Sequence, residues 1–154
     1  MSAPLPPIVK QVLKLTERAI TDAHATVFRA TDGRVLNRIS GMPVLMLTTI
    51  GRTSGERRTV MLTAPVRDGE RLVIVASRGG APRHPGWFLN LRANPSVEVT
   101  MAGWKRTMRA RVATSEERAR LWPQVVGAYR GYEQYQRRTS RQIPLVILEP
   151  ASST

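Results

Sequence analysis

Short apolar segments separated by turn-forming residues fill the chain beyond about residue 43, and this pattern constrains the fold more than any other feature. Segments 43–49 and 143–149 are apolar on both faces, as in strands that are buried on both sides. Segments 97–101 and 106–112 alternate apolar and polar residues, which predicts a half-buried hairpin. Because strands and helices do not alternate regularly, the pattern predicts an α+β fold with a mainly antiparallel barrel. The predicted strands are 43–49, 58–66, 71–77, 97–101, 106–112 and 143–149.

Helices are predicted near both ends of the chain and once between strands. Residues 7–30 carry apolar side chains at helical spacing, and residues 87–94 form a short helix that ends before a proline. A capping-box pattern, Thr114 followed by Glu117, opens a long helical region. Pro123 is expected to kink or restart that region.

At 154 residues the chain is expected to form one domain, with a barrel core over 43–149. The segment 7–30 has two interpretations: a helix packed on the core, or a basic amphipathic helix on an anionic membrane. No stretch has the roughly 20 apolar residues of a membrane span, and no signal peptide is recognisable. The expected location is therefore the cytoplasm, with peripheral binding to the inner face of the plasma membrane as the alternative.

The chain is strongly basic, with a formal net charge of +13, and 21 of its 24 basic residues are arginines. A GC-rich coding sequence favours arginine over lysine, but it does not explain why acidic residues are few. Arginine binds phosphate and carboxylate groups through a planar fork of donors. The composition therefore predicts an acidic ligand or surface, such as a phosphorylated cofactor, an anionic lipid or a nucleic acid.

The sequence contains few groups for hydrolytic or metal chemistry. It has no cysteine, and its two histidines, His24 and His84, have no carboxylates gathered around them, so no metal site is expected. The G-x-S-x-G, P-loop and G-x-G-x-x-G motifs are all absent. If the protein is an enzyme, a bound cofactor is expected to supply the chemistry.

Three clusters could bind a ligand. The turn "GRTSGERR", residues 51–58, combines two glycines with three arginines, although exposed turn arginines are often only solvated. The segment 77–80, where the predicted strand 71–77 meets the predicted loop 78–86, places a hydroxyl, a cation and two glycines at the end of a buried strand; the alternative is a mobile surface loop. Tyr129, Tyr132 and Tyr135 are the only tyrosines and would form one aromatic ribbon on a helix, as a pocket wall or as part of the core.

Three ordered blocks carry a resemblance to a known family. They are "PVLMLTTIGRTSGERR", "VIVASRGGAPRHPGWFLNLRANPSVEV" and "ARLWPQVVGAYRGYEQYQRRTSRQIPLVILE". Together they resemble the deazaflavin-dependent (coenzyme F420-dependent) nitroreductases and quinone reductases of actinobacteria over about residues 25–150. The resemblance implies a split β-barrel like that of flavin-binding oxidases, and a reduced deazaflavin cofactor with an acidic phospholactyl-oligoglutamate tail.

The resemblance also implies roles for individual residues, with the turn arginines on the acidic tail and the tyrosines on the substrate side. The residues implied to bind cofactor are Arg52, Thr53, Ser54, Arg58, Thr59, Val60, Val75, Ala76, Ser77, Arg78, Trp87, Phe88, Leu89, Asn90 and Leu91. The residues implied in catalysis are Ser77, Tyr129, Tyr132 and Tyr135. Two positions depart from the family: Arg78 stands where lysine is common, and Thr63 stands where relatives can carry an aromatic residue.

The implied reaction is hydride transfer to a quinone, with nitroaromatics as further acceptors, and with the proton relayed by Ser77 or a tyrosine hydroxyl. Three other readings remain open at this point: an FMN-dependent split-barrel reductase, a non-catalytic cofactor carrier, and an arginine-rich nucleic-acid binder. The last is disfavoured because the arginines are dispersed and no nucleic-acid-binding motif is present. The sequence leaves monomer and homodimer undecided.

Overall fold

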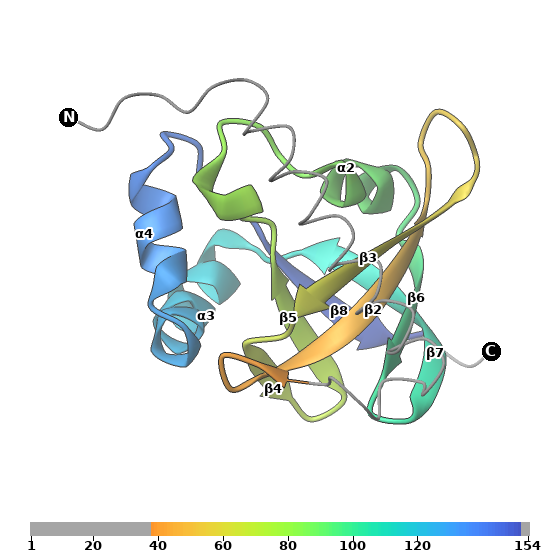
Figure 1. Cartoon of the computed structure of the whole chain (residues 1–154), viewed down its shortest axis with the longest axis horizontal. Helices are drawn as coiled ribbons and strands as arrows, with labels where there is room; N and C mark the ends of the chain where they lie inside the picture. Colours follow the sequence, from red (N-terminus) through yellow and green to blue (C-terminus); the bar gives the residue numbers. More distant parts are fainter. Residues whose placement is uncertain (1–37, 152–154) are drawn as a thin grey trace, which may run out of the picture.

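The computed structural model describes residues 38–151, and an eight-stranded antiparallel sheet dominates this part of the chain (Figure 1). The predicted helix 7–30 lies outside the described residues. The strand order is β1-β2-β6-β7-β8-β5-β4, and β3 also pairs with β2. The strands are β1 (Arg38–Ile39), β2 (Met42–Ile50), β3 (Arg57–Thr63), β4 (Val66–Asp68), β5 (Arg71–Val75), β6 (Ser96–Met101), β7 (Trp104–Val112) and β8 (Leu145–Pro150).

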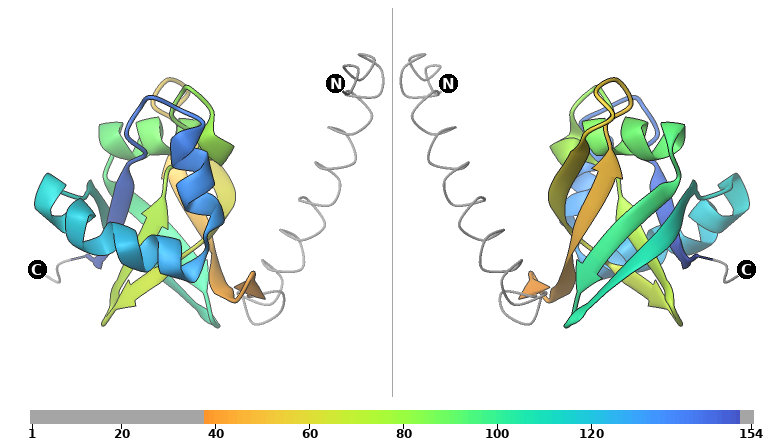
Figure 2. Two further views of the ribbon diagram at one scale, coloured as in Figure 1. Left: turned by 90° about the vertical axis from the view of Figure 1, so that its left-hand side faces the viewer. Right: turned by 90° about the vertical axis from the view of Figure 1, so that its right-hand side faces the viewer.

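The sheet curls into a half-barrel whose two ends do not join (Figures 1 and 2). β3 pairs with β2 at one end and β4 pairs with β5 at the other, and no backbone ladder connects β3 to β4 within residues 38–151. An antiparallel sheet with separate helices confirms the predicted α+β class. The helices are α2 (Gly86–Ala93), α3 (Ser115–Ala128) and α4 (Gly131–Arg137), with a single 3₁₀ turn, η1, at Arg78–Gly80.

Two apolar clusters, one on each face of the sheet, explain why apolar and polar residues do not alternate along the predicted buried strands. On β5, Leu72 and Ile74 point into the cluster inside the half-barrel, which α2 closes with Phe88. Val73 and Val75 point to the opposite face, into a second cluster formed with α3 and α4. Both faces of β5 are therefore covered beyond the exposed Arg71, and residues 72–75 are all apolar because neither side of this part contacts water.

The capping box predicted at Thr114 is confirmed. The Glu117 backbone N–H donates to Thr114 Oγ1 (3.2 Å), and the Thr114 N–H donates to Glu117 Oε1 (3.0 Å). Glu117 also accepts a bidentate pair of hydrogen bonds from Arg111, at 2.6 and 2.8 Å. The Arg111 pair, followed by the Thr114 backbone, lowers the pKa of Glu117 to about 2. The start of α3 is thus joined to β7.

The helical region does not restart at Pro123, because α3 continues through this residue to Ala128. Proline removes the hydrogen bond to the carbonyl four residues earlier, at Ala119, and Ala119 is exposed to solvent. The helical region instead divides at Tyr129, which has an extended backbone (φ −156°, ψ 111°). Gly131 follows because any side chain there would overlap the Tyr129 ring.

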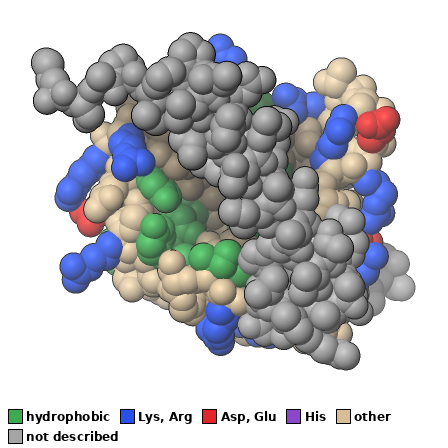
Figure 3. All heavy atoms as spheres, in the orientation of Figure 1, with side chains coloured by type: hydrophobic (Ala, Val, Ile, Leu, Met, Phe, Trp, Pro, Cys, Tyr) green, Lys and Arg blue, Asp and Glu red, His purple; other side chains and the backbone are tan. Residues whose placement is uncertain are grey.

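Other predicted boundaries also require correction. The predicted strand 58–66 divides at Pro65 into β3 and β4, because proline has no N–H to donate to a sheet. The predicted loop 78–86 contains η1, and the strand predicted from residue 143 begins at Leu145. None of the helices in residues 38–151 is long and apolar enough to cross a membrane. On the part of the face left uncovered in Figure 3, Lys and Arg side chains lie near a hydrophobic patch, and acidic side chains are few.

Candidate active site

The turn between β2 and β3 has a compact backbone that the sequence encodes through glycine. The Gly51 N–H donates to the Glu56 carbonyl (2.7 Å), and the Gly55 N–H donates to the Gly51 carbonyl (2.8 Å). A side chain at Gly51 would come within 2.5 Å of Ser54 Oγ, and Gly55 has a φ of 71°. Glycine is therefore needed at both positions, and the turn presents its side chains from a fixed backbone.

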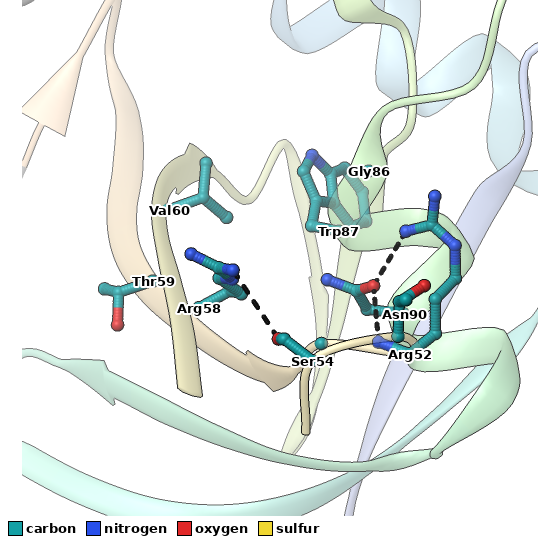
Figure 4. A pocket seen from close by; sticks show the side chains of 10 residues that line it. Arg52, Ser54, Arg58, Thr59, Val60, Gly86, Trp87 and Asn90 are labelled. Atoms are coloured by element: carbon teal, nitrogen blue, oxygen red, sulfur yellow. Dashed lines mark hydrogen bonds between the residues drawn. The ribbon is translucent and has the colours of Figure 1, made fainter. Parts of the chain in front are cut away.

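Asn90 on α2 holds this turn in place (Figure 4). Its Oδ1 accepts hydrogen bonds from the Arg52 backbone N–H (3.1 Å) and from Arg52 Nη1 (2.9 Å). Its amide Nδ2 donates to Thr49 Oγ1 (3.3 Å), and Asn90 is only 6% exposed. Within the described residues, these contacts engage only Nη1 of the Arg52 guanidinium. The remaining donors of an oriented arginine are thus available to a ligand.

Arg58 at the start of β3 is less constrained. Its Nη2 lies 3.5 Å from Ser54 Oγ and 3.3 Å from Glu56 Oε2, and its side chain is 59% exposed. An exposed pair of this kind contributes little to stability. An anionic ligand would therefore compete with Glu56 for Arg58, whereas Arg52 needs no such exchange.

A cavity of about 420 Å³ lies between β3 and α2, with this turn at one end. Arginines and hydroxyls lie on the turn side, and the Trp87 and Val60 side chains lie opposite (Figure 4). We call it the basic pocket. It is lined by Gly51, Arg52, Thr53, Ser54, Arg58, Thr59, Val60, Gly86, Trp87 and Asn90.

A second cavity, of about 340 Å³, adjoins the other half of β3, and we call it the tyrosine pocket. Met61, Leu62 and Thr63 contribute from β3, directly after the residues that line the basic pocket. The lining is Ile39, Ser40, Met42, Val44, Met61, Leu62, Thr63, Val75, Ser77, Gly79, Tyr129, Tyr132 and Tyr135. One strand therefore lines both an arginine-rich cavity and an aromatic one.

The three tyrosines pack edge-to-face, with ring centroids 5.3 to 6.4 Å apart. They do not lie on one helix as the spacing predicted, because Tyr129 caps α3 while Tyr132 and Tyr135 belong to α4. The Tyr132 hydroxyl lies 2.7 Å from Thr63 Oγ1. Burial raises the pKa of Tyr132, and a hydrogen bond with Tyr129 raises the pKa of Tyr135. Both hydroxyls therefore keep their protons at neutral pH.

The segment after β5 has an unusual backbone. Arg78, Gly79 and Gly80 have φ values of 45°, 62° and 81°, so three consecutive residues are left-handed. This turn places Ser77 in the tyrosine pocket and the exposed Arg78 beside a third cavity, of about 730 Å³. The third cavity is lined by Arg52, Arg78, Pro82, Arg83, His84, Pro85, Gly86, Leu89 and Arg141.

The predicted site residues fall into two groups. Most of them line one of the three cavities, including Val75, Ser77, Trp87, Leu89 and Asn90. Ala76, Phe88 and Leu91 are at most 1% exposed and belong to the core, so they can only support the site from beneath. Within residues 38–151, no three His, Cys, Asp or Glu side chains lie close enough together to hold a metal ion.

The comparison with known proteins decides the family. The family model described as F420H(2)-dependent quinone reductase matches residues 20–150. The chain belongs to this family. It is 45% identical to an F420H(2)-dependent quinone reductase of Mycobacterium tuberculosis strain H37Rv, over 81% of this chain and 86% of the relative.

Two solved structures have a fold similar to that of this F420H(2)-dependent quinone reductase family member. An F420-H2 dependent reductase (FDR-A) superposes with a TM-score of 0.63 at 40% identity, covering 70% of this chain and 94% of that one. A structure described as a domain-swapped dimer superposes with a TM-score of 0.67 at 36% identity, covering 92% and 98% of the two chains.

Proposed function

We propose that this protein transfers hydride from reduced coenzyme F420 to a quinone, and that β3 is the strand along which cofactor and acceptor meet. Membership of the family supports the cofactor and the reaction class. The observation that carries the proposal is the succession of the basic and tyrosine pockets along one strand. An elongated ligand with an acidic end and a planar end matches this succession in charge and in shape.

The residues of the basic pocket fit the acidic tail. Arg52 is oriented by Asn90 and retains unused donors, and Arg58 adds a second cation across the turn. Gly51 allows the turn to pack its backbone closely against Ser54, because a Cβ there would lie 2.5 Å from Ser54 Oγ. Trp87 and Val60 provide an apolar wall opposite the arginines, which suits the less polar part of the cofactor. Thr53, Ser54 and Thr59 contribute hydroxyls that can hydrogen-bond to phosphate.

When bound, the reduced deazaflavin supplies the hydride. The protein then orients the acceptor, excludes water and holds a proton near it. We propose Ser77 and the three tyrosines for these tasks, because all four line the tyrosine pocket. Tyr132 is held by Thr63 and stays protonated, so its hydroxyl can donate to a quinone oxygen, directly or through water.

Thr63 affects which electron acceptors can enter the tyrosine pocket. A threonine in place of an aromatic residue leaves more room in the tyrosine pocket and gives Tyr132 a polar partner. We propose that quinones are the physiological acceptors and that nitroaromatics are reduced as further substrates. We include in the proposal that Thr63 influences the range of quinones and nitroaromatics that the protein reduces.

The proposal also covers the domain organisation, the location in the cell and the oligomeric state. Residues 43–149 form the core of a single split-barrel domain, which the half-barrel sheet supports. The protein acts in the cytoplasm, and its segment 7–30 binds the inner face of an anionic membrane, which only the sequence pattern supports. A homodimer is supported by the relative described as a domain-swapped dimer, and light scattering on purified protein would test it.

Titration of the purified protein with coenzyme F420 and with FMN tests the cofactor assignment. We expect tight binding of F420 and weak binding of FMN, which lacks the oligoglutamate tail. Adding menadione to protein and reduced F420 should then reoxidise the deazaflavin catalytically. Binding of F420 without turnover of any quinone or nitroaromatic would indicate a carrier, and tighter binding of FMN would contradict the assignment.

A further inference from the structure

Arg141, in the connection between α4 and β8, makes an unusual set of contacts for an arginine. Its Nε donates to the Ala81 carbonyl (2.9 Å), and its Nη2 donates to the Ser77 carbonyl (2.8 Å). Its Nη1 donates to the Ala76 carbonyl (3.2 Å) and lies 3.1 Å from His84 Nδ1. One guanidinium therefore contacts four acceptors spread over residues 76–84.

None of these partners is charged in its ordinary state. Within the described residues Arg141 forms no salt bridge, and burial lowers the pKa of the neutral His84 imidazole. The backbone of Arg141 is itself fixed, because its carbonyl accepts from Gln136 Nε2 (2.8 Å) and its N–H donates to Thr139 Oγ1 (3.3 Å). The side chain thus acts as an anchored set of donors and keeps its full positive charge.

The segment that Arg141 holds contains the left-handed turn at Arg78–Gly80. Arginine at a φ of 45° is strained, and such conformations persist only where the surroundings enforce them. Gly80 fits under α4 only because it lacks a side chain: a Cβ would lie 2.6 Å from the Tyr135 carbonyl oxygen and 2.9 Å from Arg138 Cβ. Contacts on both sides of the turn therefore fix its shape.

We propose that Arg141 is a positioning residue for the reaction, acting through the turn that carries Ser77 into the tyrosine pocket and Arg78 to the third cavity. This inference rests on the proposed function for its catalytic part. The guanidinium is suited to the task because its Nε, Nη1 and Nη2 donors point in different directions within one plane. Lysine carries its donors on a single nitrogen and cannot reproduce the separate Nε, Nη1 and Nη2 contacts to the Ala81, Ala76 and Ser77 carbonyls.

Arg118 provides a matched control. It also donates to neutral acceptors, with Nε on the Ile143 carbonyl (3.1 Å) in the same connection and Nη2 on Gln136 Oε1 (3.1 Å) in α4. It lines neither the tyrosine pocket nor the third cavity. Gln136, which contacts the Arg141 carbonyl, also accepts from the Ile143 N–H (2.8 Å) and keeps that contact when Arg118 is lost. Losing Arg118 should therefore reduce stability without altering the turn.

The test compares R141Q, R141K and R118Q with wild type in two experiments. Amide hydrogen exchange, measured without cofactor, should be faster over residues 77–84 in R141Q and R141K and unchanged there in R118Q. Turnover of reduced F420 with menadione, measured well below each melting temperature, should fall roughly 10- to 100-fold in the Arg141 variants. It should stay within about twofold of wild type in R118Q, as expected for a change away from the site.

The two proposals fail in different ways. Unchanged exchange over residues 77–84 in both Arg141 variants would overturn the positioning role, whatever the activity. Faster exchange with wild-type turnover would also overturn it, because the turn would then not matter for the reaction. A wild-type protein that neither binds nor oxidises reduced F420 would instead refute the proposed function. A further variant, R141A, allows a direct test with added guanidinium ion. Partial recovery of its turnover would support the positioning role.

Discussion

Replacing Arg52 with alanine should weaken cofactor binding by an amount that depends on the acidic tail. Asn90 already holds the turn and one guanidinium nitrogen of Arg52. This side chain is therefore largely ordered before the ligand binds and loses little further conformational entropy on binding. Arg58 lacks such a partner and must exchange Glu56 for the ligand. The structure therefore predicts a larger loss for R52A than for R58A.

The expected magnitudes follow from the exposure of the two arginines. A hydrogen bond to a charged group contributes about 1.5–3 kcal/mol, and the exposed Arg52 belongs at the low end of that range. At about 1.4 kcal/mol per decade, R52A should raise the dissociation constant roughly tenfold. Arg58 resembles a surface ion pair of about 0.2–1 kcal/mol, which corresponds to a roughly 1.4- to 5-fold loss.

The assay is a fluorescence titration with full-length F420 and with a fragment that ends at the ribityl chain. Both variants should bind the fragment as wild type does. R57A is the matched control, because Arg57 neighbours Arg58 but pairs with Glu98 (2.7 Å) and does not line the basic pocket. R57A removes the same charge and should change affinity less than twofold. Equal weakening toward both ligands, or an R57A effect as large as that of R52A, would refute the reasoning.

Four further predictions concern other parts of the protein. E56Q should tighten binding of full-length F420 up to about fivefold in the same titration, because Arg58 loses its competing carboxylate. Y132F should lower kcat with nearly unchanged cofactor Kd if the Tyr132 hydroxyl donates the proton, whereas unchanged kcat would favour Ser77. Burial, then Arg141 and Arg92, lower the pKa of His84 below its ordinary 6.5, so the unfolded chain binds the proton more readily than the folded one. The stability of the protein should therefore fall as the pH drops below 6.5. In melting temperatures measured over a range of pH, H84N should remove this part of the decline. Deleting residues 1–20 should weaken sedimentation with anionic liposomes and leave reduction of a water-soluble quinone intact, and loss of soluble activity would instead indicate a helix packed on the core.

Much of the fold could be predicted because burial leaves a clear record in the sequence. Residues 72–75 of β5 are all apolar since both faces of the strand are covered there, and the capping box marks the start of α3 to the residue. Strand order could not be predicted, because β5 pairs with β8 across more than 70 residues, as in Leu72 opposite Leu148. A restart of the helical region at Pro123 was wrongly expected, because a sequence pattern does not reveal that Ala119, four residues earlier, is exposed to solvent.

The candidate site was predictable where several unusual residues stand together. The arginine-rich turn and the tyrosines are conspicuous in composition and spacing, and the structure brings each group to a cavity. Asn90 was expected only through the family resemblance, since a single polar residue on a short helix looks solvated. Arg141 was missed, because it follows Arg137 and Arg138 in a basic run. Only its contacts with four distant acceptors distinguish it from those neighbours.

The central place of β8 has a consequence for how the protein is made. This strand pairs with β7 on one side and β5 on the other, and it follows both of them in the chain. Until Leu145–Pro150 leaves the ribosome, β5 and β7 each have an unpaired edge and both apolar clusters are incomplete. The nascent chain therefore cannot close its core before this strand has emerged, and chaperones can bind the exposed strands until then.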